Sequence, residues 1–194
     1  WQVEWRKTAL STMPLAPKKG LVAHYEFEGH LADTSGHYRH GRTLRGEVTY
    51  DEGQVGTGAV FDPEVHVALG VPTFDRTDPF SMAFWMISSG TREKAVMQKV
   101  DDPESRRGFQ LIMDEPKTIA PLQDGSHMFF RLVHRWPDDA IEVKTKDRLH
   151  SKLANHITVT YDGSGKAWGL KLYVNGEQQD VEVTHDNLSG SIRT

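Results

Sequence analysis

Apolar and polar residues alternate in short runs along most of this chain, and glycine, proline or aspartate residues separate the runs. The clearest alternation spans residues 157–161, where Ile, Val and Tyr take every second position and Thr the positions between. Successive side chains of a strand point to opposite faces, so this period of two predicts a strand with one buried face. Residues 170–174 repeat the pattern, and Asn175-Gly176 is typical of a type I′ hairpin turn. Residues 157–183 therefore predict three antiparallel strands in a meander.

Similar runs recur along the chain after Gly20 and predict further strands. They cover residues 21–27, 59–61, 65–69, 80–87, 95–100, 109–113, 130–133 and 140–143. Hardly any window between them has apolar residues at helical spacing. Many short strands at close spacing favour a sandwich or barrel over alternating α/β units, so we expect an all-β fold.

One of these runs, 80–87, is apolar at almost every position, so both faces of the predicted strand are apolar. Strands with two apolar faces usually lie inside a sheet that is covered on both sides. We therefore expect this strand to be central and Trp85 to lie in the core. Because a buried Phe or Met contributes roughly 1.5–3 kcal/mol, this strand should be the least tolerant of polar substitution.

Residues 1–19 differ from the rest of the chain. Trp1, Trp5 and Leu10 lie near helical spacing and predict a short helix, and the stretch with prolines and lysines that follows has the composition of a linker. We expect an N-terminal arm and linker over residues 1–19. Residues 20–194 are expected to form one domain, since sandwiches of this size are routinely single domains.

The composition argues against several classes of function. A net charge of −4 gives no broad basic surface for nucleic acid or anionic lipid. No run approaches the ~18 consecutive apolar residues of a membrane-spanning helix, so we expect a soluble chain without membrane insertion. The absence of cysteine removes disulfides, thiolate zinc sites, cysteine nucleophiles and covalent haem attachment, and no haem is expected.

Several segments together resemble, in order and spacing, the laminin-G-like, concanavalin A-like jelly-roll modules of bacteria. They are LVAHYEFEGHLADTSG (21–36), HG (40–41), QVGTGAVFD (54–62), FSMAFWM (80–86), HITVTYDG (156–163) and LYVNG (172–176). The resemblance covers nearly everything after Lys19. It implies a jelly-roll sandwich of two curved antiparallel sheets packed face to face, preceded by the short N-terminal arm.

The chain also resembles, more closely, the laminin-G-like inserts of large exported bacterial proteins that carry cytochrome-c-like and planctomycete-type domains. This second resemblance rests on residues 134–145 and 188–194, and it implies export to the periplasm or the cell surface. The sequence departs from the family pattern at Ala154, where a Trp is usual. Family members also continue past the equivalent of Thr194 into closing strands, so the resemblance implies a sheet with an open edge.

Two places are candidates for a metal ion. The resemblance implies a structural Ca²⁺ on the loop of Asp33, since this ion takes about six to eight oxygen ligands; the alternative is that Asp33 caps its own turn. Four histidines also lie close together in sequence, namely His24, His30, His37 and His40. A His-x-x-His loop lacks the helical spacing and third ligand of a zinc site. The resemblance places His40 where family members have a His-Gly tight turn, and it implies a structural hydrogen bond as the role of His40.

The motifs do not indicate catalysis. Glycoside hydrolases on this fold commonly carry Glu-x-Asp-x-x-Glu or Glu-x-Asp-x-Glu on one strand, and retaining enzymes hold their two carboxylates about 5–5.5 Å apart. Neither pattern occurs; Glu26 and Glu28 are interpreted as solvated acids at a strand edge. Ser164, between two glycines, has the pattern of a turn and not of a nucleophile elbow. We therefore expect no enzyme, with a glycoside hydrolase as an alternative.

The best candidate for a binding site surrounds Trp136. Sandwich proteins typically bind sugars with an exposed aromatic ring and nearby polar groups. Trp136 precedes a proline on a predicted turn, and its polar neighbours are Arg131, His134, Arg135, Asp138 and Asp139. The alternative is that Trp136 folds back onto the sandwich or packs against a neighbouring domain. For Trp168, between a turn and a strand, the sequence favours neither exposure nor burial.

Two functions follow from these observations. In the first, the chain is a non-catalytic module of a larger bacterial protein and binds a glycan through Trp136 and its neighbours. In the second, it is a structural scaffold: the same surface and the arm with Trp1 and Trp5 contact other domains of the parent polypeptide or its missing C-terminal segment.

Overall fold

The chain is an all-β sandwich in the computed structural model, as its sequence predicts. The structure describes residues 19–88, 94–102, 104–115, 117–118, 124–150 and 152–194. Within these ranges all the regular elements are strands apart from one 3-10 turn, η1 (Ala167–Gly169), and no helix is long and apolar enough to cross a membrane. The helix predicted for Trp1–Leu10 lies outside the described residues.

The chain divides into two compact units, Trp1–Pro72 (unit 1) and Thr73–Thr194 (unit 2). The sequence instead predicted one domain over residues 20–194. A boundary near Lys19 stays a prediction, because the residues before it are not described.

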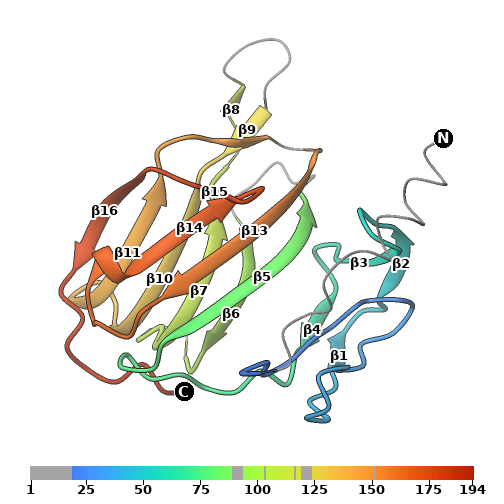
Figure 1. The fold of residues 1–194 in the computed structure, drawn as a ribbon, viewed down its shortest axis with the longest axis horizontal. Coiled ribbons are helices and arrows are strands. Elements are labelled where there is room, and N and C mark those ends of the chain that lie inside the picture. The colour runs from blue at the N-terminus through green and yellow to red at the C-terminus, as the bar shows by residue number, and fades with distance from the viewer. Residues whose placement is uncertain (1–18, 89–93, 103, 116, 119–123, 151) are drawn as a thin grey trace. The chain divides into compact units, whose positions relative to one another are not determined.

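Unit 2 contains the two sheets of the sandwich, which lie face to face in Figure 1. The larger sheet has the order β16-β11-β10-β7-β6 and the smaller the order β15-β14-β13-β5, and all neighbouring strands are antiparallel. The larger sheet consists of β6 (Lys94–Val100), β7 (Gly108–Met113), β10 (Met128–Arg135), β11 (Asp139–Thr145) and β16 (Val181–Asp186). The smaller consists of β5 (Phe80–Ile87), β13 (Ala154–Tyr161), β14 (Leu170–Val174) and β15 (Glu177–Gln178). A third sheet contains β8 (Lys117–Thr118), β9 (Asp124–Ser126) and β12 (Leu149–His150).

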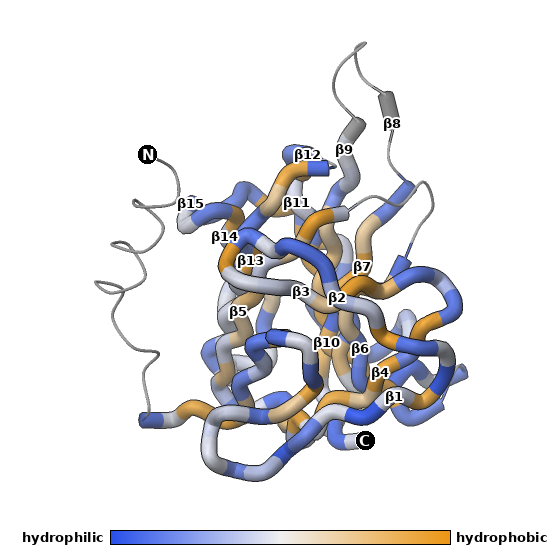
Figure 2. The backbone as a smooth tube through the Cα atoms, turned by 90° about the vertical axis from the view of Figure 1, so that its right-hand side faces the viewer, coloured by the Kyte–Doolittle hydropathy of each residue, from blue (hydrophilic) through white to orange (hydrophobic). Residues whose placement is uncertain are grey.

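The hydrophobic core lies between the two sheets and is made of alternate residues from the facing strands. Phe130 on β10 has no exposed surface, and its ring centroid lies 6.2 Å from that of Phe80 and 6.1 Å from that of Phe109. These rings join residues of both sheets into one cluster. Figure 2 shows the same alternation as hydrophobic and hydrophilic segments interleaved along the strands. The period of two in the sequence therefore becomes one apolar layer.

The meander predicted from residues 157–183 is present as β13, β14 and β15. Residues Ile157 to Tyr161 of β13 pair without interruption with β14. The turn to β15 has φ of 53° at Asn175 and 85° at Gly176, the left-handed values that a type I′ turn requires at both central positions. The third predicted strand is divided in the structure. After the turn, the chain forms the short strand β15 in the smaller sheet and then β16, which joins the larger sheet.

The prediction of a central strand at 80–87 is wrong. Among the described residues, β5 pairs only with β13 and is an edge strand. Its inner residues face the core, whereas on its outer face Trp85 is 46% and Ile87 is 56% exposed, so Trp85 is not a core residue either. In an antiparallel sandwich one face of a sheet stays outside the core, and an apolar outer face does not by itself show that something covers it.

Unit 1 contains two antiparallel pairs of strands. They are β1 (Arg42–Arg45) with β4 (His66–Ala68), and β2 (Thr49–Glu52) with β3 (Thr57–Val60). The strand predicted for residues 21–27 is reduced to an isolated bridge between Tyr25 and Asp33. Phe27 has a φ of 58°, a left-handed value that the extended backbone of a strand does not allow. The chain instead turns back at this point.

We expect truncation of Phe130 to destabilise unit 2 strongly. Phe130→Ala removes a fully buried ring and leaves a cavity between the sheets, which typically costs about 3–5 kcal/mol. Phe129→Ala is the matched control, because Phe129 precedes it on the same strand and is only half-buried, beside Lys144. Chemical denaturation should give a clearly smaller loss for Phe129→Ala, and equal losses would contradict the assignment of faces on β10.

Candidate functional site

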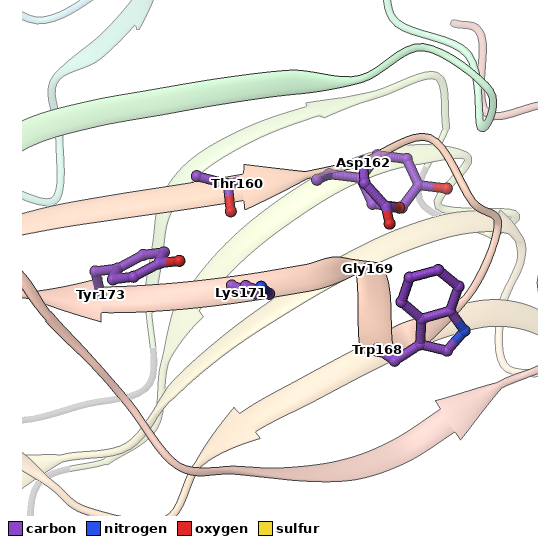
Figure 3. A pocket seen from close by; sticks show the side chains of 7 residues that line it. Thr160, Asp162, Trp168, Gly169, Lys171 and Tyr173 are labelled. Carbon is purple, nitrogen blue, oxygen red and sulfur yellow. The ribbon is translucent and has the colours of Figure 1, made fainter.

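An open pocket of about 260 Å³ lies on the outer face of the smaller sheet of unit 2. Its lining comes from two neighbouring strands and the turn that joins them. The lining residues are Thr160, Tyr161, Asp162, Trp168, Gly169, Lys171 and Tyr173. Figure 3 shows Thr160, Lys171 and Tyr173 along the strands, with Asp162 and Trp168 at the turn.

The strand register brings the polar lining residues together. Thr160 of β13 stands opposite Lys171 of β14, and the neighbouring pair on the same face includes Tyr173. Core residues alternate with these positions, so the strands that bury Val159 and Leu172 must present Thr160, Lys171 and Tyr173 outward. The packing of the core thereby positions this face of the pocket.

The turn over residues 162–169 holds Trp168 at the end of the pocket. The Asp162 carboxylate accepts a hydrogen bond of 2.8 Å from the Ser164 backbone N–H, and the Tyr161 hydroxyl accepts one of 2.7 Å from the Gly165 N–H. A Cβ at Gly169 would overlap the side chains of Asp162 and Ser164 where they now lie, so glycine lets both side chains approach the backbone closely. This hydrogen-bonded turn presents Trp168 with 69% of its surface exposed.

The Asp162 carboxyl group in the pocket carries a negative charge at neutral pH. Hydrogen bonds from the side chain and backbone of Ser164 lower the pKa of the Asp162 carboxyl, and the positive charge of Lys171 acts in the same direction. Asp162 is therefore ionised. The pocket combines an exposed indole, an anion, a cation and two hydroxyl groups on neighbouring elements, which suits a small polar ligand that also has an apolar face.

The predicted site at Trp136 has a different environment. Trp136 is half-buried, with the Arg131 guanidinium 4.3 Å from its ring centroid and the His185 ring at 4.6 Å. Arg131 forms an ion pair with Glu142, whose other oxygen accepts a 2.6 Å hydrogen bond from the Thr184 hydroxyl. The Trp136 ring therefore packs on Arg131, whose positive charge is already paired with Glu142 of the neighbouring strand. This geometry fits the alternative prediction for Trp136, that its ring folds back onto the sandwich.

The remaining residues of the Trp136 hypothesis do not converge on its ring in the contacts that the structure records. His134 lies at a β-bulge of β10 and its Nδ1 is 2.6 Å from the Ser191 carbonyl oxygen. Arg135 and Asp138 are exposed, and the backbone carbonyl of Asp138 accepts a hydrogen bond from Asn187. Of the residues predicted around Trp136, Arg131 has a recorded contact with the ring.

Asp33 lies at the centre of a hydrogen-bonded loop in unit 1. It is 6% exposed, and its Oδ1 accepts bonds from the N–H groups of His24 (2.9 Å) and Ser35 (3.0 Å). Its Oδ2 accepts bonds of 2.9 Å from the Ser35 hydroxyl and the Arg39 N–H. Burial by itself would raise the pKa of Asp33, but these four bonds outweigh it and hold the pKa well below its usual range.

These donors decide what Asp33 can bind. A Ca²⁺ ion needs the oxygen lone pairs that the four N–H and O–H donors already occupy. Within the described part of the chain, no three His, Asp or Glu side chains are placed to share a metal ion. The surroundings of Asp33 therefore do not fit calcium, and calcium binding stays an untested prediction. His40 accepts a 3.1 Å hydrogen bond from the Asp33 N–H, which agrees with its predicted structural role.

Sequence reasoning missed the pocket at Trp168. The signal was nevertheless present, because the predicted meander already pairs residues 157–161 with residues 170–174. That pairing sets Thr160 beside Lys171 and places Trp168 next to Asp162 at the connecting turn. Exposure of the indole, in contrast, depends on how the turn folds and is not visible in the alternation.

Comparison of the chain with protein-family models, with curated proteins and with solved structures finds no match.

We expect Glu142 to act as a structural partner of Arg131. The side chains are 6% and 14% exposed, so Glu142→Gln leaves a cation in a largely buried place without its anion, a change that typically costs about 3–5 kcal/mol. Glu64→Gln breaks the exposed Arg45–Glu64 pair and should cost less than about 1 kcal/mol. Urea denaturation of both variants measures the difference, and a Glu142→Gln protein as stable as the parent would refute this role.

Unit 1 should lose stability in acid through Asp33. Because folding lowers the pKa of Asp33, its stabilising contribution is complete above the unfolded value of about 3.9 and is lost as the pH falls toward the folded value. Asp33→Asn should destabilise unit 1 by about 1–3 kcal/mol at neutral pH and reduce its sensitivity to acid below about pH 4. Backbone amide NMR signals of His24 and Arg39 report both effects. Identical acid titrations of the two proteins would contradict the assignment.

Proposed function

We propose that unit 2 is a non-catalytic glycan-binding module and that the sugar binds in the pocket at Trp168. The observation that carries this proposal is the exposed indole at the end of a pocket lined by hydrogen-bonding side chains. The laminin-G-like resemblance of the sequence adds support for a binding module within a larger exported bacterial protein.

The indole supplies the apolar contact that a pyranose ring needs. Sugars present patches of C–H groups on one face, and an exposed aromatic ring buries such a patch. Trp168 is the most exposed tryptophan of the described residues, and its short turn is fixed by hydrogen bonds. A turn whose backbone is already ordered loses little conformational freedom when a ligand binds.

The polar residues that line the pocket can orient a sugar through hydrogen bonds. The hydroxyl groups of Thr160 and Tyr173 both donate and accept, Asp162 accepts and Lys171 donates, so the pocket can serve several sugar hydroxyls at once. A volume of about 260 Å³ is slightly below the range of about 300–1,000 Å³ that is common for ligand pockets. The pocket therefore suits one sugar unit of a chain that continues into solvent.

The lining also favours binding over hydrolysis. Asp162 is the single carboxylate among the residues that line the pocket. Glycoside hydrolysis ordinarily needs an acid and a second carboxylate on opposite sides of the scissile bond. A sugar in this pocket would be held but would lack the pair of groups that cleaves it.

Replacement of Trp168 tests the proposal directly. On a glycan array, followed by titration of the positive glycans, Trp168→Ala should weaken binding by about tenfold or more, the effect of about 1.4 kcal/mol of lost stacking. Trp136→Ala is the matched control and should bind as the parent does, because its ring packs on Arg131 and His185.

Two results would overturn the assignment. A blank array for the folded parent protein rejects glycan binding. Loss of binding in Trp136→Ala together with retention in Trp168→Ala moves the site back to Trp136.

A further inference from the structure

One long edge of the smaller sheet is open among the described residues. Strand β5 pairs with β13 along its whole length, from Phe80 opposite Tyr161 to Ile87 opposite Ala154. No described strand pairs with its other side, which forms an edge of the sheet in Figure 1. Such an edge carries a row of backbone N–H and C=O groups that can accept another strand.

This edge lacks the features that usually prevent pairing. Residues 80–87 contain no charged residue, proline or glycine, and the register with β13 has no bulge. Other edges of the two sheets carry charges, such as Lys94 and Lys99 on β6 and Glu182 and Asp186 on β16. Charged side chains and bulges are the common protection of edge strands, and uncharged segments of this kind pair readily.

The core-facing side chains of β5 are less completely buried than those of its neighbour β13. On β13 the inner residues Ile157 and Val159 have no exposed surface. The inner residues of β5 beyond Phe80 are only half-buried, although they pack against the same core; they are Met82, Phe84 and Met86. A strand added beside β5 would cover these three side chains.

Beyond Ser81, the outer face of β5 is apolar as well. Ala83, Trp85 and Ile87 point away from the core and are exposed, and the Trp85 ring lies against His156 of β13 with centroids 5.0 Å apart. Both faces of the open edge therefore gain from contact with apolar side chains. The edge favours a partner strand that is uncharged and apolar on both faces.

We propose that this partner is β5 of a second copy of the chain, paired antiparallel across a two-fold axis. The uncharged strand is its own complement, since an isologous pairing sets Ala83, Trp85 and Ile87 of one copy beside the same residues of the other. The inner residues Met82, Phe84 and Met86 likewise meet their equivalents. The two smaller sheets become one continuous sheet that runs through both copies.

A charge placed on the edge tests this interface. Sedimentation velocity of the full chain over a series of concentrations should show a monomer–dimer equilibrium. Ala83→Lys adds a charge to the outer face of the edge strand in each copy, where the partner strand is apolar, so the dissociation constant should rise at least about tenfold. Thr158→Lys is the matched control, because Thr158 faces the same side directly opposite Ala83 but on a strand whose two edges are both paired. It should leave the equilibrium unchanged.

Hydrogen exchange shows whether the backbone of β5 forms the contact. In the dimer, the β5 amides that point away from β13 should exchange more slowly than in dilute monomer, and the amides of β13 should not change. The inference is overturned if the chain stays monomeric at all concentrations, if folded Ala83→Lys dimerises like the parent, or if the β5 amides gain no protection.

Discussion

Burial of alternate side chains between two antiparallel sheets is the interaction on which the rest of unit 2 depends. The rings of Phe80, Phe109 and Phe130 join both sheets in one cluster, and the strands cannot rotate without exposing them. Since side chains alternate along a strand, each buried residue also assigns its two neighbours to the outside. The pocket at Trp168 is a product of this constraint, because Thr160 lies outward only while Val159 and Tyr161 lie inward.

The two outer faces of the sandwich have different chemistry. On the larger sheet, Arg131 and Glu142 are paired, and Trp136 and His185 pack beside the pair, so polar groups there are occupied within the protein. On the smaller sheet, Trp168, Lys171 and Tyr173 line an open pocket. Trp136 and Trp168 thus differ in what their surroundings leave available to a ligand, and that difference favours the smaller sheet as the binding face.

The parts of the fold that were predictable from sequence depend on local chemistry. Alternation at residues 157–161 specifies a strand, and Asn175-Gly176 tolerates the left-handed backbone of its turn, so the meander needed no tertiary information. The wrong predictions concern residues whose environment depends on the tertiary structure. Trp85 and Phe27 are residues that often lie in buried strands, yet Trp85 lies on an uncovered face and Phe27 takes a left-handed φ where the chain turns toward Asp33. The Trp136 ring packs against His185, which is distant in sequence, and the exposure of Trp168 depends on the fold of its turn, so neither environment is visible in the alternation.

The direction in which the pocket faces has a consequence for how a pair of chains would meet a ligand. A two-fold axis perpendicular to a continuous sheet keeps the outer faces of both smaller sheets on the same side of the dimer. The two Trp168 side chains would then face the same surface. Repeated sugar units on a polymer or a cell envelope could then be engaged at two points, and the second contact would form at the high effective concentration that the first creates. Weak individual sites would in that arrangement give durable attachment, with release requiring both contacts to open together.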